Sequence, residues 1–252
     1  MIKIFLGLTP FIFITFLGFM FGRYKILDLD KAKILNLFLF YIAVPALIIN
    51  FIAQIEIGQI DLKQIISYLF MQIICGSFTF YVVTKFFKKT ITESIIWSLT
   101  VALSNHVTLL LPITKIYFKD DVIVQVGSII LMDCIILLSI ITFFLELATK
   151  NDIKLLIFIR NVILNPLILS ILIGLFLFGL DINIKDSPIE YTLDKLAACV
   201  SPVGLFAIGI ILSFYTNEVI NKLTISITIL KLIISPIVLL FISYIIFNLG
   251  LP

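Results

Sequence analysis

Long apolar runs fill most of this 252-residue chain, and only short connectors separate them. A helix that crosses a membrane needs roughly 20 mostly apolar residues, and such runs occupy 4–22, 34–54, 64–84, 94–117, 122–148, 155–179, 195–214 and 224–248. Charged residues make up 13 % of the chain, whereas soluble domains carry about 25 %. The sequence therefore predicts an all-α polytopic membrane protein with about eight transmembrane helices.

The Lys and Arg residues of the connectors are divided unequally between the two sides of the membrane. The connectors that follow odd-numbered runs hold Arg23, Lys25, Lys31, Lys33, Lys85, Lys88, Lys89, Lys150, Lys154 and Lys222, and the opposite side holds Lys3, Lys63, Lys119, Lys185 and Lys195. Cytoplasmic loops carry the excess of positive charge, so we expect both termini outside the cytoplasm. The strong excess of Lys over Arg and the many Ile residues suggest a bacterial protein of the inner (cell) membrane.

Two parts of the chain resemble each other at a spacing of 166 − 10 = 156 residues. Pro10 and Gly18 enclose P-F-I-F-I-T-F-L-G, and Pro166 and Gly174 enclose P-L-I-L-S-I-L-I-G. The first run thus matches the sixth. Because the matched runs are an odd number of spans apart, the two copies run in opposite directions across the membrane. Such an inverted repeat is a transporter architecture.

Pro45 and Pro202 form a second matched pair, in V-P-A-L and S-P-V-G-L, with 202 − 45 = 157. Proline removes a backbone donor and clashes with the preceding helical turn, so both are predicted helix breaks, with simple kinks as the alternative. In this register, 1–150 form a first five-helix repeat and 151–252 an incomplete second repeat of three helices. The partner of the fourth run would begin near 94 + 157 = 251, so we expect the last two helices of the second repeat to be missing.

The fourth run contains the polar stretch S-N-H-V-T-L-L-L-P, which begins at Ser104 and ends at Pro112. Irregular polar backbone at membrane depth must be buried in protein or line a water-filled cavity, and broken helices mark substrate sites in secondary transporters. The amide of Asn105 could donate to an anion beside a helix start, and Pro112 frees backbone groups nearby. The alternative is a kinked helix in which Asn105 holds neighbouring helices together.

Three further polar residues are candidates for substrate binding. His106 can titrate near neutral pH, and a packing histidine bonded to a carbonyl fits equally well. Thr108 is either a ligand or a helical residue bonded to its own backbone. Asp133 lies near the middle of the fifth run, where a carboxylate needs a partner and marks either a site or a structural pair. The cations considered as its partners are Lys231, Arg160 and Lys115.

The sequence lacks the motifs of several other classes of protein. It contains no H-E-x-x-H, no G-x-S-x-G and no G-x-x-x-x-G-K, so neither an intramembrane hydrolase nor an ATP-driven pump is favoured. Cys75, Cys134 and Cys199 lie far apart in apolar runs, which argues against a disulfide framework or a metal site. We therefore expect no enzymatic activity, no cofactor and no metal.

Together these motifs resemble the auxin efflux carrier family, which includes PIN-like bacterial transporters. The resemblance rests on F-Y-I-A-V-P-A-L (40–47), the polar stretch from Ser104 to Pro112, N-P-L-I-L-S-I-L-I-G-L (165–175), S-P-V-G-L-F-A-I-G (201–209) and K-L-I-I-S-P (231–236). It implies ten helices in two inverted repeats, with broken fourth and ninth helices that cross at the substrate site. This chain is similar only through helix eight.

The resemblance implies a secondary transporter of a small organic anion, a carboxylate or dicarboxylate such as malate or malonate, that works by alternating access. Its partners would be this anion and the lipid bilayer, with no nucleic acid. Without the second broken helix, we expect an open polar groove that exposes Asn105. We also expect no activity as a monomer, so that a homodimer or a separately encoded C-terminal fragment would complete the site. The alternative is a truncated, non-transporting remnant of such a carrier.

Overall fold

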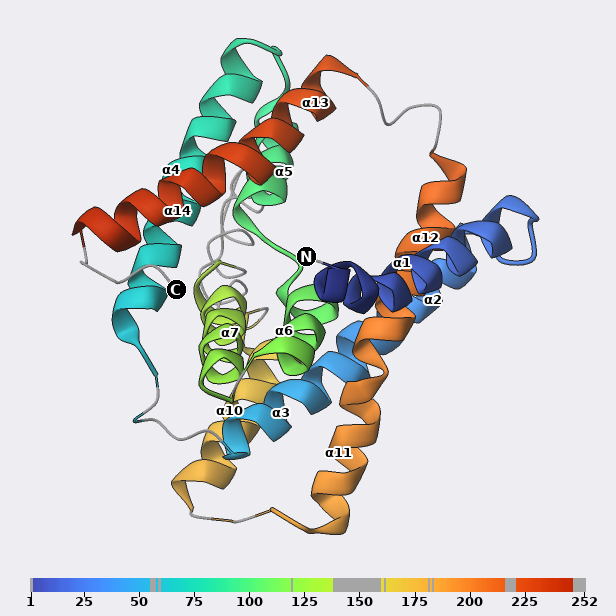
Figure 1. Cartoon of the computed structure of the whole chain (residues 1–252), viewed down its shortest axis with the longest axis vertical. Coiled ribbons are helices and arrows are strands. Elements are labelled where there is room, and N and C mark those ends of the chain that lie inside the picture. The colour runs from blue at the N-terminus through green and yellow to red at the C-terminus, as the bar shows by residue number, and fades with distance from the viewer. Residues whose placement is uncertain are drawn as a thin grey trace. The chain divides into compact units, whose positions relative to one another are not determined.

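The structure, a computed structural model, describes residues 2–54, 58, 60–118, 120–137, 160, 162–180, 182, 184–215 and 221–246. The regular elements of these residues are all helices (Figure 1). Five are long and apolar enough to cross a membrane: Leu29–Gln54, Leu62–Lys85, Ile91–Tyr117, Pro188–Phe214 and Lys222–Ile245. Shorter apolar helices span Gly7–Arg23, Val122–Ile135 and Pro166–Gly179. Each of the eight predicted runs thus holds a helix, while the exact number of membrane crossings stays a prediction.

The chain forms two compact units. Unit 1 comprises Met1–Gln59, Asn105–Leu131 and Ile163–Asn217, and unit 2 comprises Ile60–Ser104, Met132–Val162 and Glu218–Pro252. One boundary falls between Ser104 and Asn105, inside the predicted fourth span. The units therefore do not coincide with the two predicted repeats, 1–150 and 151–252, and the repeats themselves stay a prediction.

Unit 1 pairs helices of the first predicted repeat with helices of the second. Its elements are α1 (Ile2–Arg23), α2 (Leu29–Phe38), η1 (Leu39–Ala43), α3 (Val44–Gln54), η3 (His106–Leu110), α6 (Leu111–Tyr117), α7 (Asp120–Met132, whose last residue falls in unit 2), α10 (Pro166–Gly179), α11 (Pro188–Ala198) and α12 (Val200–Phe214). Helix α1 packs along α12, and α10 packs along α3. The first span thus contacts the seventh and the sixth contacts the second, a reciprocal pairing that an inverted repeat would produce.

Glycines let α1 and α12 approach closely. A Cβ atom at Gly18 would overlap the carbonyl oxygen of Phe206, and one at Gly209 would overlap the carbonyl oxygen of Thr15. Gly22, one turn beyond Gly18, lies against the side-chain hydroxyl of Ser213. Small residues of this kind allow backbone-to-backbone packing between membrane helices. The matched Gly174 of α10 lies against the side chain of Ile52 in α3.

Unit 2 is built on the pair α4 (Leu62–Lys85) and α5 (Ile91–Ala102). Its other described elements are η4 (Asp133–Leu137), α13 (Lys222–Ile229), η5 (Leu230–Ile234), α14 (Ser235–Phe241) and η6 (Ile242–Ile246). Helix α13 and η5 contact α5, whereas α14 and η6 contact α4. The segment 222–246 therefore lies across both helices of the pair.

Side-chain caps set most helix starts. An Asp, Asn, Ser or Thr precedes the first helical residue and accepts from an amide two or three residues later, at Asp28, Asp61, Thr90, Asn165, Ser187 and Asn221. Such caps satisfy amides that have no partner within the helix. The cap at Ser187, followed by Pro188, starts the seventh span seven residues before the predicted 195 (195 − 188 = 7). The predicted start lies too far along the chain because Glu190, Asp194 and Lys195 lower the apolar character of the first part of this span.

Three prolines follow π-helical turns instead of ending their helices. Pro45, Pro112 and Pro236 each lie two residues after η1, η3 or η5. The residue just before each proline donates to the carbonyl five residues back: Val44 to Leu39, Leu111 to His106 and Ser235 to Leu230. Proline crowds the preceding turn, and the wider π-helical turn gives the chain room. Pro45 therefore lies in a continuous helix, whereas Pro202 lies in the first turn of α12, just after an interruption at Cys199.

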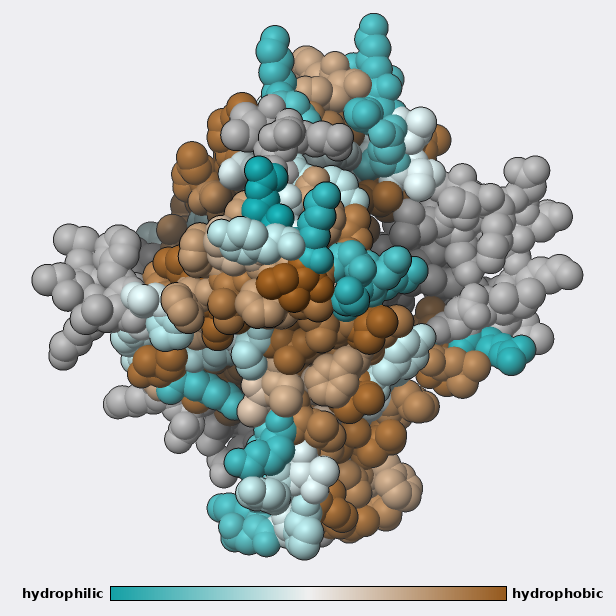
Figure 2. Space-filling model, turned by 90° about the vertical axis from the view of Figure 1, so that its right-hand side faces the viewer, coloured by the Kyte–Doolittle hydropathy of each residue, from teal (hydrophilic) through white to brown (hydrophobic). Residues whose placement is uncertain are grey.

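Large apolar side chains are exposed along these helices. Phe13 of α1, Phe176 of α10 and Leu232 of η5 expose 62, 64 and 67 % of their surface. Brown apolar residues also occupy much of the described surface on the face shown in Figure 2. An apolar surface this extensive is unfavourable in water and favourable against lipid hydrocarbon. The exposed residues thus fit a protein of the membrane.

Candidate transport site

The helix of the fourth span is interrupted between α5 and η3. Residues 103–105 are not helical, and Leu103 is extended at φ −83° and ψ 132°. This interruption lies within the candidate span Ile91–Tyr117. It leaves carbonyls at the end of α5 and amides at the start of η3 without helical partners. The helix is therefore broken before Asn105, whereas Pro112 lies inside the continuing helix.

Asn105 caps the resumed helix. Its side-chain oxygen Oδ1 accepts from the backbone amide of Thr108 at 3.3 Å and from the Thr108 hydroxyl. Asn105 is exposed, and within the described part of the chain its Nδ2 group makes no hydrogen bond. The cap therefore uses the oxygen of this side chain and leaves both amide hydrogens available to a ligand.

His106 and Thr108 are more enclosed than Asn105. His106 is buried with 4 % of its surface exposed. The methyl group of Thr108 packs on α12, since a Cβ at Gly204 would lie 2.7 Å from it. The methyl group of Thr108 thus contacts α12, and its hydroxyl group donates to Asn105.

In unit 1, the helical segment that begins at His106 packs against residues next to Pro45 and Pro202. Leu39, Ala43 and Val200 form a buried cluster, and the partly buried Val44, Val107 and Val203 pack against it. Val44 precedes Pro45, Val203 follows Pro202, and Val107 belongs to η3. The predicted breaks at Pro45 and Pro202 and the stretch after Asn105 therefore meet in one place.

Unit 2 covers the carbonyl end of α5. The Lys231 ammonium donates to the carbonyls of Thr100 and Leu103, both at 2.6 Å. The side-chain amide of Gln72 donates to the carbonyl of Ala102 at 3.2 Å. A cation at this position also complements the negative end of the helix dipole. These carbonyls thus have donors despite the interruption.

Asp133 belongs to the same polar network in unit 2. It is buried with 7 % exposed, and its Oδ1 accepts from Nε2 of Gln72 at 2.6 Å. One of its partners is thus the amide of Gln72, while Lys231, one of the expected cations, donates to carbonyls. Lys115, another of those cations, belongs to unit 1, as do Asn105, His106, Thr108 and Pro112. No single unit therefore unites Asp133 with the other predicted site residues.

Gln72 is the main residue that sequence reasoning missed here. It lies 1 % exposed in the middle of the apolar run 64–84 and donates to both Ala102 and Asp133. An amide in such a position was a usable signal, since polar groups inside membrane spans need partners and are often functional. Lys231 gave the same signal, but only the structure identified its acceptors.

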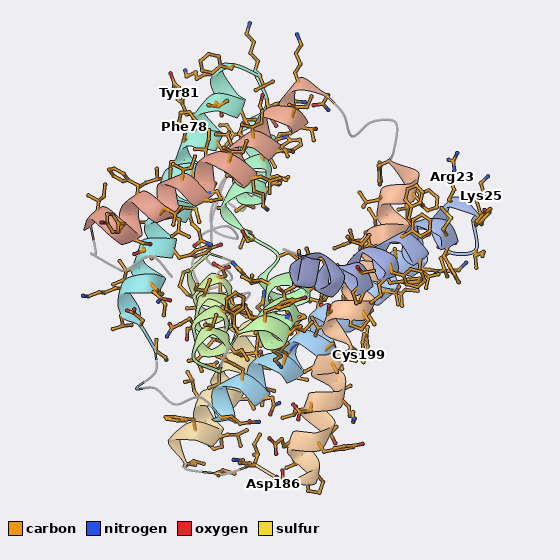
Figure 3. All side chains as sticks on the ribbon, in the orientation of Figure 1. Arg23, Lys25, Phe78, Tyr81, Asp186 and Cys199 are labelled. Atoms are coloured by element: carbon orange, nitrogen blue, oxygen red, sulfur yellow. The ribbon has the colours of Figure 1, made fainter. Side chains whose placement is uncertain are left out.

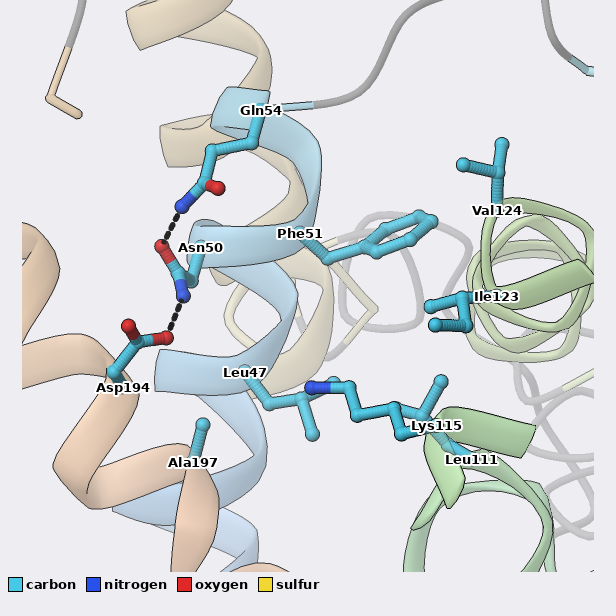
Figure 4. Close-up of a pocket in the computed structure, with 10 residues that line it drawn as sticks. All are labelled: Leu47, Asn50, Phe51, Gln54, Leu111, Lys115, Ile123, Val124, Asp194 and Ala197. Atoms are coloured by element: carbon cyan, nitrogen blue, oxygen red, sulfur yellow. Dashed lines mark hydrogen bonds between the residues drawn. The ribbon is translucent and has the colours of Figure 1, made fainter. Parts of the chain in front are cut away.

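Unit 1 also contains a polar pocket between α3, α6, α7 and α11, with a cavity volume of about 220 Å³ (Figure 4). Asn50 donates from Nδ2 to Oδ1 of Asp194 at 2.5 Å. Gln54 donates from Nε2 to Oδ1 of Asn50 at 2.6 Å and to Oε1 of Glu190 at 2.9 Å. Lys115 lines the other side of the pocket. The sequence did not indicate this site, because its polar residues lie far apart in the chain.

Metal ligands are not gathered in the described ranges, where no group of three or more His, Cys, Asp and Glu residues could hold an ion. The polar features on which a site can be built are therefore amides, carboxylates, Lys side chains and freed backbone groups. Such groups can bind a charged solute.

The described residues form helices, and five of these helices are able to span a bilayer, one of them with an interruption at a polar turn; the chain is therefore a multi-pass membrane protein. The model of the membrane transport protein family, which includes the auxin efflux carriers, matches residues 3–249. The chain therefore belongs to this family of membrane transporters. The family is one of transporters and not of enzymes. No curated protein matches the sequence.

Proposed function

We propose that this transporter is a secondary carrier of a small organic anion, a carboxylate or dicarboxylate such as malate or malonate. The observation that supports this proposal is the exposed amide of Asn105 at the helix interruption. The carbonyls of Thr100, Ala102 and Leu103 already accept from Lys231 and Gln72. The group left for a solute at Asn105 is therefore a donor, and donors beside a helix start favour anions.

The other predicted site residues have supporting roles in this proposal. Thr108 orients Asn105 by taking its oxygen, so that Nδ2 points away from the cap. Pro112 shapes the turn through the π-helical segment before it. His106 and Asp133 are buried in the described state, and alternating access would expose them in another state of the cycle.

The test is uptake of radiolabelled malate or malonate by membrane vesicles that contain the whole chain. Asn105→Ala removes a donor worth about 1–3 kcal/mol, so uptake at low substrate should fall roughly five- to a hundredfold. Asn105→Ser keeps a good helix cap but has no amide, so it should be equally defective. The matched control is Asn221→Ala, because Asn221 caps α13 through the backbone amide and hydroxyl of Thr224 in the same way.

The two variants of Asn105 separate ligand binding from capping. If Asn105 were only a cap, Asn105→Ser would transport normally, and Asn105→Ala would lose only as much protein as Asn221→Ala. Uptake that is unsaturable, or that is equal in wild-type and Asn105→Ser vesicles, would overturn the proposal. Protein amount in each vesicle preparation is measured alongside uptake.

We further propose that both termini lie outside the cytoplasm. Arg23 and Lys25 extend from the turn between α1 and α2, where Figure 3 labels them, and positive loop residues favour the cytoplasmic side. Single cysteines at Lys31 and Lys185 test this orientation. A membrane-impermeant thiol reagent added to intact cells should label the second and not the first.

A further inference from the structure

The polar pocket of unit 1 carries opposite charges on separate walls. Asp194 is on α11, and Lys115 is on α6, from which it extends toward the wall formed by α3 and α11 (Figure 4). No ion pair joins the two, and within the described ranges the Lys115 ammonium makes no hydrogen bond or ion pair. The pocket therefore has a positive group and a negative group, neither of which neutralises the other.

The negative wall is held in place by side-chain amides. Asn50 donates to Oδ1 of Asp194, and Gln54 donates both to Asn50 and to Glu190. Glu190 in turn accepts at Oε2 from the backbone amide of Asp186, at the start of α11. This chain of bonds fixes the Asp194 carboxylate, whose Oδ2 accepts from no donor within the described part of the protein. One carboxylate oxygen is thus free for a ligand.

The remaining lining is apolar and consists of Leu47, Phe51, Leu111, Ile123, Val124 and Ala197. The volume of about 220 Å³ exceeds the ~150 Å³ cavity that holds a benzene molecule and is below the ~300 Å³ of the smallest drug-sized pockets. A compact molecule with an aliphatic side chain fits this space.

We propose that the pocket binds a small aliphatic zwitterion of the α-amino-acid type, with its carboxylate on Lys115 and its ammonium on Asp194. A simple anion would satisfy Lys115 but bring like charge near Asp194, which is unfavourable. A simple amine would have the converse problem with Lys115. The pocket does not include Asn105, so this inference goes beyond the organic-anion site and does not depend on it.

Three matched probes test the charge pattern. L-leucine carries both charges, 4-methylpentanoate lacks the ammonium, and 3-methylbutylamine lacks the carboxylate. Binding of each to the whole purified chain in lipid nanodiscs is measured by calorimetry. Leucine should bind about tenfold or more tightly than either single-charge probe, because each of them leaves one charged group unpaired.

Two variants then assign the charges. Lys115→Met should lower leucine affinity to that of the amine, and Asp194→Asn should lower it to that of the carboxylate probe. Asp194→Asn keeps an oxygen for Asn50, so the wall retains its bonds. Lys222→Met, which removes an exposed cation of unit 2, should leave leucine binding unchanged.

Each other result overturns the inference. Equal affinity for 4-methylpentanoate and leucine would show an anion site, and equal affinity for the amine would show a cation site. Binding that survives Lys115→Met would lie elsewhere on the chain. Absence of binding by all three probes, in protein that remains monodisperse, would leave Lys115 and Asp194 without a ligand. Because the readout is binding and the site excludes Asn105, none of these results bears on anion uptake.

Discussion

The pair α1 and α12 of unit 1 and the pair α4 and α5 of unit 2 are held together by different means. In unit 1, α1 and α12 meet backbone to backbone at Gly18 and Gly209, and Gly22 lies against the side chain of Ser213. In unit 2, side-chain amides, hydroxyls and an ammonium bridge the helices, as in the bond from Thr84 to Ser94 between α4 and α5. Lipid gives apolar helices no hydrophobic reason to associate. Close packing and polar bonding are the two remaining ways to do so, and each is sensitive to a different substitution.

The glycine contact should be the most sensitive. Gly209→Ala places a methyl group against the backbone of Thr15 and Phe19, and no side chain can move to relieve the overlap. We expect a loss of more than about 3 kcal/mol, seen as poor recovery of monodisperse protein and a much lower melting temperature. The matched control is Gly76→Ala in α4, where the new Cβ would lie 3.6 Å from Ala102. That change should be neutral or stabilise by up to about 1 kcal/mol.

The Lys231 bridge should come next. Lys231→Met leaves the part-buried carbonyl of Leu103 without its donor, at about 1–3 kcal/mol, and also removes the donor of the exposed Thr100 carbonyl. Heating followed by size-exclusion chromatography should therefore show a clear fall in stability. The exposed Lys222, at the start of the span Lys222–Ile245, should tolerate the same substitution within about 0.5 kcal/mol. Equal effects at both positions would contradict the role of Lys231 as a bridge between η5 and α5.

The Gln72 pair should show a smaller loss that a second substitution reverses in part. Gln72→Leu removes the amide from the buried carboxylate of Asp133, at about 1–3 kcal/mol. Replacing both partners with apolar residues is often nearly neutral, so Gln72→Leu with Asp133→Leu should be more stable than Gln72→Leu alone. A double-mutant cycle of melting curves measures this coupling. Additive losses would mean that the bond between Gln72 and Asp133 contributes little.

The smallest effect is expected at Gly174, the partner of Gly18 in the predicted repeat. Gly174→Ala would bring its Cβ to 2.8 Å from Cβ of Ile52, a side-chain atom instead of backbone. We expect a loss of about 1–2 kcal/mol. Ile52→Gly removes the overlapping Cβ atom, so it should cost less stability in the Gly174→Ala chain than in the unmodified chain. A loss as large as that of Gly209→Ala, with the same cost of Ile52→Gly in both chains, would show that the two glycine contacts are equivalent.

Much of the fold followed from local signals. Helices lie in all eight predicted runs, and caps such as Asp28 and Thr90 stand where the sequence places a polar residue before an apolar run. The start of α11 at Pro188 was missed because hydropathy outweighed the cap at Ser187. The prolines were harder to interpret. Pro45 and Pro112 lie in continuous helices, because a π-helical turn takes up the strain that would otherwise end the helix.

The candidate site was predictable only in part. Its location was indicated by Asn105 within an apolar run, since a polar turn at membrane depth is visible in any sequence. The hydrogen-bond partners of the polar residues were not indicated, because Lys231 lies 131 residues from Thr100 and Asn50 lies 144 residues from Asp194. Nothing in local composition relates such residues.

The sequence by itself therefore determined that this is a helical, multi-pass membrane protein of a transporter family, and which stretch of it is polar at membrane depth. Hydropathy, caps and short motifs are local properties of the chain, so they can be recognised in the sequence without a structure. Only the tertiary structure decided that the chain divides between Ser104 and Asn105, and that Lys231 and Gln72 cover the end of α5. It also placed Lys115 and Asp194 around one pocket. Hydrogen bonds and ion pairs act over a few ångströms, and the packing of distant helices sets which groups come that close.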